Sequence, residues 1–191
     1  MRPSGPMAKR DLRRRLLAAR AGLGPTELAQ AAAEITQHLL ADQQVCRART
    51  VAAYVPVGRE PGSARLLDAL VARGTQVLLP VLLPDDDLDW APYSGSLVEA
   101  SGGLLEPDGA RLGPQAIAEA DVVLVPGLAV DAHGIRMGRG GGSYDRALAG
   151  VPAGVLTIVV LHDGEVLDQV PCEPHDCPVG AVVTPSGLHR F

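Results

Sequence analysis

The sequence predicts an α/β protein: a three-layer sandwich in which helices cover both faces of a mostly parallel central sheet, with a helical N-terminus. Two observations predict it. Short apolar runs alternate with segments of helical pattern along residues 50–184, and glycine or proline separates many of them. Strands that alternate with helices form parallel sheets, because a crossover must carry the chain back between parallel strands. Residues 7–191 are expected to form one such domain, with residues 1–6 as a disordered leader unless Met7 is the true start.

Two helices are expected before the alternation begins. Residues 8–20 carry leucines at helical spacing among basic side chains, which is the pattern of an amphipathic helix. Gly22 and Gly24 interrupt this pattern, and the alanine-rich residues 26–41 then form a second helix.

The later elements follow from apolar runs and from the residues that end them. Strands are expected at residues 50–55, 75–81, 89–93, 122–125, 155–161 and, as the last element, 181–184. Helices are expected at residues 63–73, 114–120 and 143–149. Residues 95–113 are expected to be a loop, because glycine and proline turn signals recur there. Ligands of parallel sheets bind beyond the carboxyl ends of the strands, so the loops after Val55 and Val125 should open onto one edge.

Composition narrows the class of protein. The net charge is −5, which argues against general nucleic-acid binding, although basic residues crowd residues 9–20 around the single lysine, Lys9. The apolar runs are too short to cross a bilayer, and the N-terminus lacks the apolar core of a signal peptide. The three cysteines show no metal-type pair, and their odd number argues against a disulfide framework. A cytoplasmic protein is expected, without a membrane or nucleic-acid partner.

The strongest functional signal follows the expected strand 122–125. Arg136 precedes the glycines at 138 and 140–142, and Arg139 lies between them. Asp145 follows. Glycines let backbone N–H groups approach an anion, and arginine donors match phosphate oxygens. A carboxylate such as Asp145 is the ligand that Mg²⁺ uses beside nucleotide phosphates. The pattern is neither a Walker A motif nor a dinucleotide fingerprint, and glycine runs alone are often turns. Together these residues predict a polyphosphate site with Mg²⁺.

Other candidates are weaker when taken alone. Lys9 and Arg13 lie four residues apart on one helix face, which is most often a solvated face but could clamp the same phosphates if the helix folds back. Glu60 follows an expected strand at the ligand edge, where its carboxylate could accept N–H donors of a heterocycle. Trp90 and Tyr93 are interpreted as packing residues. No metal-ligand spacing or nucleophile motif is present in the late histidine-containing loops.

The chain resembles the 5-formyltetrahydrofolate cyclo-ligase family, also called methenyltetrahydrofolate synthetases. The resemblance rests on KRDLRRRLL (9–17), AAYVPVGRE (52–60), GLLEP (103–107), VPGLAVDAHGIRMGRGGGSYDR (125–146) and HDCPVGAVVT (175–184), of which the fourth is highly specific. It implies a Rossmann-like sandwich similar to sugar-phosphate isomerases. It also implies a monomeric enzyme that uses ATP and Mg²⁺ to convert 5-formyltetrahydrofolate into 5,10-methenyltetrahydrofolate, releasing ADP and phosphate.

The resemblance also implies roles for individual residues. ATP would contact Lys9, Arg10, Arg13, Arg136, Met137, Gly138, Arg139, Gly140, Gly141, Gly142, Ser143 and Tyr144. The folate would contact Val55, Glu60, Arg139, Gly140, Gly141, Gly142 and Ser143. Catalytic roles would fall to Arg136, Arg139 and Tyr144, and Mg²⁺ would bind Asp145 and Asp176.

Two positions depart from the family pattern, and other functions stay open. Ser143 stands where the family usually has a tyrosine, and Gly180 where it has a second acidic residue. Both departures favour the alternative of a non-catalytic or repurposed homologue that binds nucleotide or folate as a regulator. Further alternatives are a sugar-phosphate isomerase or transferase, and a nucleic-acid binder that uses the basic helix.

Overall fold

A seven-stranded sheet forms the centre of the molecule. The computed structural model describes residues 6–173 and 176–191. In sheet order the strands are β12 (Gly187–Arg190), β11 (Ala181–Thr184), β9 (Leu156–Val160), β6 (Val122–Pro126), β1 (Thr50–Ala52), β2 (Gln76–Leu82) and β3 (Leu88–Pro92). The five inner strands are parallel, and only the edge strands β3 and β12 pair antiparallel with their neighbours. The expected mostly parallel sheet is confirmed.

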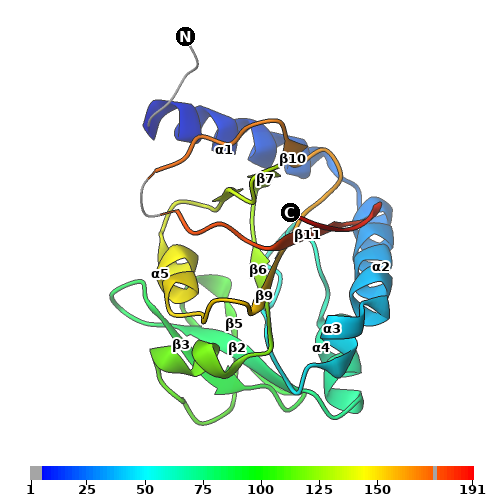
Figure 1. Cartoon of the computed structure of the whole chain (residues 1–191), viewed down its shortest axis with the longest axis vertical. Helices are drawn as coiled ribbons and strands as arrows, with labels where there is room; N and C mark the ends of the chain where they lie inside the picture. Colours follow the sequence, from blue (N-terminus) through cyan, green and yellow to red (C-terminus); the bar gives the residue numbers. More distant parts are fainter. Residues whose placement is uncertain (1–5, 174–175) are drawn as a thin grey trace.

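Helices cover both faces of this sheet, because successive side chains of a strand point to opposite sides. Val122 and Leu124 of β6 pack in one core with α2 (Pro25–Ala41) and α4 (Ala64–Ala72). Val123 and Val125 pack in the other. The second core is closed by the 3₁₀ helix η2 (Pro114–Glu119) and by α5 (Ser143–Ala149), and short α3 (Gln43–Arg47) follows α2 on the first face (Figure 1). The three-layer sandwich is confirmed.

The basic helix α1 (Pro6–Gly22) folds back over a second, smaller sheet (Figure 1). This sheet has the order β10 (Val166–Leu167), β7 (Ala129–Asp131) and β8 (Arg136–Met137). Leu12 and Leu16 of α1 pack against Leu128 and Met137 of this layer. Since β8 leads directly into the glycine run, this packing brings the basic helix to the candidate phosphate site.

A buried ion pair fixes the far end of α1. Arg20 donates from Nε and Nη2 to the two carboxylate oxygens of Glu165 at 2.7 and 2.8 Å, and from Nη2 to the carbonyl oxygen of Gly127 at 2.6 Å. The two charged side chains are only 4% and 7% exposed. Charge-assisted, bidentate hydrogen bonds of this kind are the strong ones, so Arg20 anchors α1 to the loop after β6.

Several expected element boundaries were wrong. The structure places a hairpin of β4 (Leu97–Glu99) and β5 (Leu105–Pro107) inside the expected loop 95–113, joined by the short 3₁₀ turn η1 (Ser101–Gly103). The glycines that signalled a loop form this turn, with positive φ at Gly102 and Gly103. The strand expected at 50–55 ends at Ala52, and 181–184 is not the last element because β12 pairs back onto it.

The leader expected at residues 1–6 lies outside the described residues except for Pro6, the first residue of α1. Within the described part of the chain, no helix is long and apolar enough to span a bilayer. Trp90 is completely buried and Tyr93 is 7% exposed, both in the cores, so their interpretation as packing residues is confirmed.

Candidate functional site

A pocket of about 330 Å³ opens at the carboxyl ends of β1 and β6. The loop after β1 contributes Val55 and Glu60, and the end of β6 and the loop that follows contribute Pro126 and Gly127. The expectation that these two loops share one edge of the sheet is therefore confirmed. The volume lies within the range of small-molecule sites.

Nearly all the predicted site residues line this one pocket. They are Lys9, Arg13, Val55, Glu60, Arg136, Met137, Gly138, Arg139, Gly140, Gly141, Gly142, Ser143, Tyr144, Asp145 and Asp176. Arg10 is the exception, since it is exposed on α1 and does not line the pocket. Other lining residues were not predicted from the sequence, namely Tyr54, Val57, Pro80, Leu82, Leu88, Leu104, Leu105, Glu106, Pro126, Gly127 and Glu173.

The glycine loop, residues 138–142, needs glycine at positions 138 and 140 because arginine side chains lie directly against its backbone there. A Cβ atom at Gly138 would stand 2.9 Å from Nη1 of Arg136, and one at Gly140 would stand 3.3 Å from Cζ of Arg13. Gly140 also has a φ of 109°, which side-chain-bearing residues rarely adopt. The loop thus places backbone and guanidinium groups together at the surface of the pocket.

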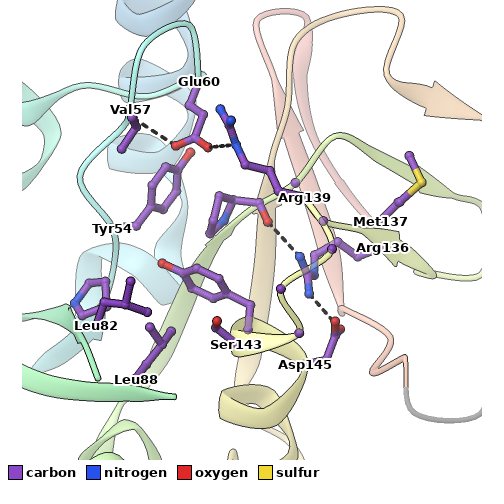
Figure 2. A pocket seen from close by; sticks show the side chains of 18 of the residues that line it. Tyr54, Val57, Glu60, Leu82, Leu88, Arg136, Met137, Arg139, Ser143 and Asp145 are labelled. Carbon is purple, nitrogen blue, oxygen red and sulfur yellow. Dashed lines mark hydrogen bonds and ion pairs between the residues drawn. The ribbon is translucent and has the colours of Figure 1, made fainter. Parts of the chain in front are cut away.

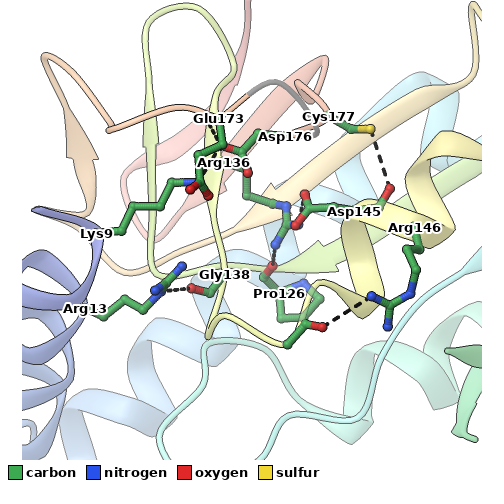
Figure 3. Close-up of polar contacts among 11 residues, drawn as sticks. Lys9, Arg13, Pro126, Arg136, Gly138, Asp145, Arg146, Glu173, Asp176 and Cys177 are labelled. Atoms are coloured by element: carbon green, nitrogen blue, oxygen red, sulfur yellow. Dashed lines mark hydrogen bonds and ion pairs between the residues drawn. The ribbon is translucent and has the colours of Figure 1, made fainter. Parts of the chain in front are cut away.

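Arg136 lies at the base of the loop with its guanidinium almost fully buried. Nη1 donates to the carbonyl oxygen of Pro126 at 3.0 Å, and Nη2 donates to Oδ1 of Asp145 at 2.8 Å (Figure 3). Its Nε is buried without a hydrogen-bond partner among the described residues. A buried guanidinium held on two sides is a rigid positive charge, which is suited to an anionic ligand.

The basic helix does reach the glycine loop. Arg13 of α1 donates from Nε to the carbonyl oxygen of Gly138 at 2.9 Å (Figure 3). The sequence left open whether Lys9 and Arg13 form a solvated face or fold back over the loop, and the structure shows the second arrangement.

Lys9 is held by acidic side chains. Its Nζ lies 2.6 Å from Oδ2 of Asp176 and 2.7 Å from Oε2 of Glu173. Burial by itself lowers the pKa of Lys9, but the hydrogen bonds and charges of Asp176 and Glu173 outweigh it and raise the pKa above 10.5. Lys9 is therefore charged at neutral pH, and the two carboxylates use two of the three N–H donors of its ammonium.

Glu60 lines the pocket from the loop after β1. Its Oε2 accepts from the backbone N–H of Val57 at 3.0 Å, and its Oε1 accepts from Nε of Arg139 at 2.8 Å (Figure 2). The Glu60 side chain is 10% exposed, whereas the Arg139 side chain is 55% exposed. The carboxylate is thus fixed at the pocket wall, and the arginine reaches it from the glycine loop.

The loop that carries Glu60 is tied to the rest of the site. Arg59 donates to the carbonyl oxygens of Arg20, Ala21 and Leu23 at the end of α1. The hydroxyl of Tyr54 donates to the carbonyl oxygen of Pro61 at 2.5 Å. These bonds hold Glu60 in a defined place relative to the basic helix.

Tyr144 supplies a neutral phenol. Burial raises the pKa of Tyr144 above its usual value of 10.0, and the charge of Glu60 raises it further, while Arg136 opposes both. The hydroxyl therefore keeps its proton at neutral pH. It can act as a hydrogen-bond donor to a ligand, but not as a general base.

The remaining wall of the pocket is apolar. It consists of Pro80, Leu82, Leu88, Leu104 and Leu105, which come from β2, β3 and the β4–β5 hairpin. The pocket consequently combines a cationic end with an apolar end. This arrangement fits a polyphosphate at one end and a flat heterocycle at the other.

The two aspartates expected to bind metal line the same pocket, each beside a cation. Asp145 pairs with Arg136, and Asp176 pairs with Lys9. Within residues 6–173 and 176–191, no three histidine, cysteine, aspartate or glutamate side chains form a metal-binding group. Mg²⁺ nevertheless commonly uses only one or two carboxylates together with substrate phosphates and water. The donor set therefore fits a magnesium ion that arrives with a nucleotide.

The two positions that depart from the family pattern differ in location. Ser143 lines the pocket at the start of α5. Gly180 is absent from the pocket lining, and its N–H donates to the carbonyl oxygen and hydroxyl of Thr157 beside β11. Ser143 is therefore the departure that alters the pocket itself.

The histidines of the late loops form no part of this pocket within the described residues. His175 lies outside these residues, and Nε2 of His162 contacts the carbonyl oxygen of Arg59.

Comparisons with known proteins match nearly the whole chain. The 5-formyltetrahydrofolate cyclo-ligase family profile matches residues 6–185. A relative from Mycolicibacterium smegmatis named 5-formyltetrahydrofolate cyclo-ligase is 45% identical over 94% of this chain and 95% of its own. One of the same name from Escherichia coli is 30% identical over 90% and 97%. The NMR structure of Aquifex aeolicus 5,10-methenyltetrahydrofolate synthetase superposes with a TM-score of 0.82 at 26% identity, covering 95% of this chain and 92% of that one.

Proposed function

The chain belongs to the 5-formyltetrahydrofolate cyclo-ligase family, and from this membership and its pocket we propose that it converts 5-formyltetrahydrofolate into 5,10-methenyltetrahydrofolate at the expense of ATP. The observation that carries the proposal is the two-ended pocket, in which the glycine loop and an apolar wall face one cavity. A ligase of this kind must hold a polyphosphate and a heterocycle in contact, and this cavity has an end suited to each.

ATP binds at the cationic end in this proposal. The backbone N–H groups of the glycine loop and the guanidinium groups of Arg13, Arg136 and Arg139 contact its phosphates. Lys9 joins them through the N–H donor of its ammonium that the two carboxylates do not use. Arg10, which is exposed outside the pocket, acts through its charge alone if it contributes to ATP binding.

The folate binds at the other end, with its ring between the apolar wall and Glu60. Glu60 accepts N–H donors of the pterin, and Val55 with Ser143 lines the cavity beside it. Ser143 leaves more room than an aromatic side chain would, so the neighbouring leucines provide the apolar contact area at this end.

The chemistry is phosphoryl transfer by positioning and electrostatics. The formyl oxygen attacks the γ-phosphorus, the bond to ADP breaks, and an iminium phosphate forms. N10 then attacks the iminium carbon and loses its proton, and the formyl oxygen leaves as part of inorganic phosphate. Fixed cations and N–H donors stabilise charge that develops in such steps, and this effect is typically the largest in catalysis. Arg136, Arg139 and the protonated hydroxyl of Tyr144 are the groups that supply it.

Asp145 and Asp176 would hold a magnesium ion, directly or through water. The ion neutralises phosphate charge when bound. The proposal also includes a cytoplasmic location and a monomeric state. The net charge of −5 is in keeping with the lack of a nucleic-acid partner.

The test is an absorbance assay. Purified protein with MgATP and 5-formyltetrahydrofolate should develop methenyl absorbance and release ADP in equal amounts. Absence of turnover, beside an active control ligase, would reject the enzymatic proposal. Calorimetric binding of both ligands without turnover would instead support the second candidate, a regulator, which Ser143 in the pocket favours.

A further inference from the structure

Arg139 joins the two ends of the pocket through one ion pair. It belongs to the glycine loop at the cationic end, and its Nε contacts Oε1 of Glu60 at the other end (Figure 2). Glu60 is nearly buried and has a second hydrogen bond from the N–H of Val57, whereas more than half of the Arg139 side chain is exposed. Arg139 is therefore the movable partner, and Glu60 is the fixed one.

This pair is the easiest of the pocket's ion pairs to break. The Lys9–Asp176, Lys9–Glu173 and Arg136–Asp145 pairs have side chains that are 6% and 7%, 6% and 32%, and 2% and 18% exposed, so the cation of each pair is buried. Separating buried charges leaves each without water or partner, whereas an exposed arginine regains water when it leaves a carboxylate. Among the described ion pairs of the pocket, a ligand can therefore recruit Arg139 at the lowest cost.

We propose that the Arg139–Glu60 pair makes the two substrates bind cooperatively. This inference rests on the proposed function, in which the heterocycle donates hydrogen bonds to Glu60 and the ATP phosphates bind Arg139. Either substrate must break the pair when it binds alone, but the second to arrive finds the pair already broken. The cost is thus incurred once in the ternary complex instead of twice, and each substrate tightens the binding of the other by the same factor.

The size of the coupling equals the strength of the pair. An ion pair with one largely exposed partner corresponds to a coupling of about fivefold in affinity at most. Glycine residues on both sides of Arg139 give the loop backbone the freedom to follow the side chain.

Calorimetry with non-reacting ligands tests the coupling. The probes are 5-formyltetrahydrofolate and an ATP analogue with a β,γ-methylene bridge in the presence of Mg²⁺, so that no turnover occurs. Each is titrated into the whole protein alone and with the other at saturation. We expect the same increase in affinity, measurable and no larger than about fivefold, in both orders.

Two variants separate this mechanism from a general charge effect. Glu60→Gln releases Arg139, so the analogue alone should bind about fivefold more tightly than it binds the wild type. Arg139→Ala releases Glu60, so the folate alone should bind more tightly although an arginine has been removed. Glu106→Gln is the matched control: it removes the same charge from the pocket lining, but its Oε1 accepts from the N–H of Leu82, not from an arginine.

The outcomes are distinct. Coupling in the wild type and in Glu106→Gln, with its loss in both other variants, supports the inference. Independent binding in the wild type, or coupling that persists in Arg139→Ala, overturns it while leaving the proposed function intact. Failure of either ligand to bind the wild type at all rejects the proposed function and this inference together.

Discussion

Replacing Gly138 by alanine should damage catalysis, whereas the same change at Gly141 in the same loop should not. A Cβ at Gly138 would lie 2.9 Å from Nη1 of Arg136, about 0.5 Å short of the 3.4 Å at which ordinary contact begins. At Gly141 the nearest atom is Oγ of Ser143 at 3.7 Å. Neither glycine has a positive φ, so alanine fits both backbones and the two changes differ only in this contact.

The guanidinium of Arg136 cannot move away freely. Its Nη1 is bonded to Pro126 and its Nη2 to Asp145, and its side chain is 2% exposed. Shifting it weakens at least one buried charge-assisted hydrogen bond, worth about 2 kcal/mol. If that stabilisation is used in the transition state, turnover falls by about 30-fold.

The assay is methenyl formation under saturating MgATP and folate, with thermal unfolding measured on the same samples to establish that both variants are folded. We expect Gly141→Ala to stay within about threefold of the wild type. Equal losses in the two variants would contradict the argument from the Arg136 contact. Full activity of a folded Gly138→Ala variant would show that the position of Arg136 does not matter for turnover.

Three other outcomes can be measured. Arg20→Ala leaves Glu165 buried without its cation, so the free energy of unfolding measured with denaturant should fall by about 3 kcal/mol. A fall of less than about 1 kcal/mol would refute the stabilising role of the buried Arg20–Glu165 pair. Because burial raises the pKa of Tyr144 in the folded state above 10.0, the folded protein resists an ionisation that the unfolded chain allows. The free energy of unfolding should therefore fall as the pH rises above about 10, and Tyr144→Phe should make this decline shallower. Asp145→Asn should raise the Mg²⁺ concentration for half-maximal turnover by about tenfold, and an unchanged magnesium titration would remove Asp145 from the metal site.

Local pattern was sufficient for much of the fold. The alternation of apolar runs and helical segments predicted the parallel sheet and both helical layers, because side-chain periodicity is set within a few residues. The same kind of signal failed for residues 95–113. Leu105 and Val98 are exposed, so the hairpin that carries them has no alternation of buried and exposed positions from which it could be recognised. That hairpin supplies part of the apolar wall of the pocket.

Within the pocket, the glycine loop and its arginines were visible in the sequence because they are contiguous. Their partners were not. Tyr54 and the leucines of the apolar wall come from separate segments of the chain, and each looks like an ordinary core residue until the fold places it at the pocket.

Local residue patterns were enough to predict the layered α/β fold and the chemistry of the glycine loop, since both depend on residues close together in the chain. Which charges neutralise one another became known from the three-dimensional fold alone. Arg139 and Glu60 are 79 residues apart, Arg20 and Glu165 are 145 apart, and Lys9 and Asp176 are 167 apart. Electrostatic energy falls with distance in space. The return of α1 sets that distance for Lys9 and Arg20, whereas the shared edge of β1 and β6 sets it for Arg139 and Glu60.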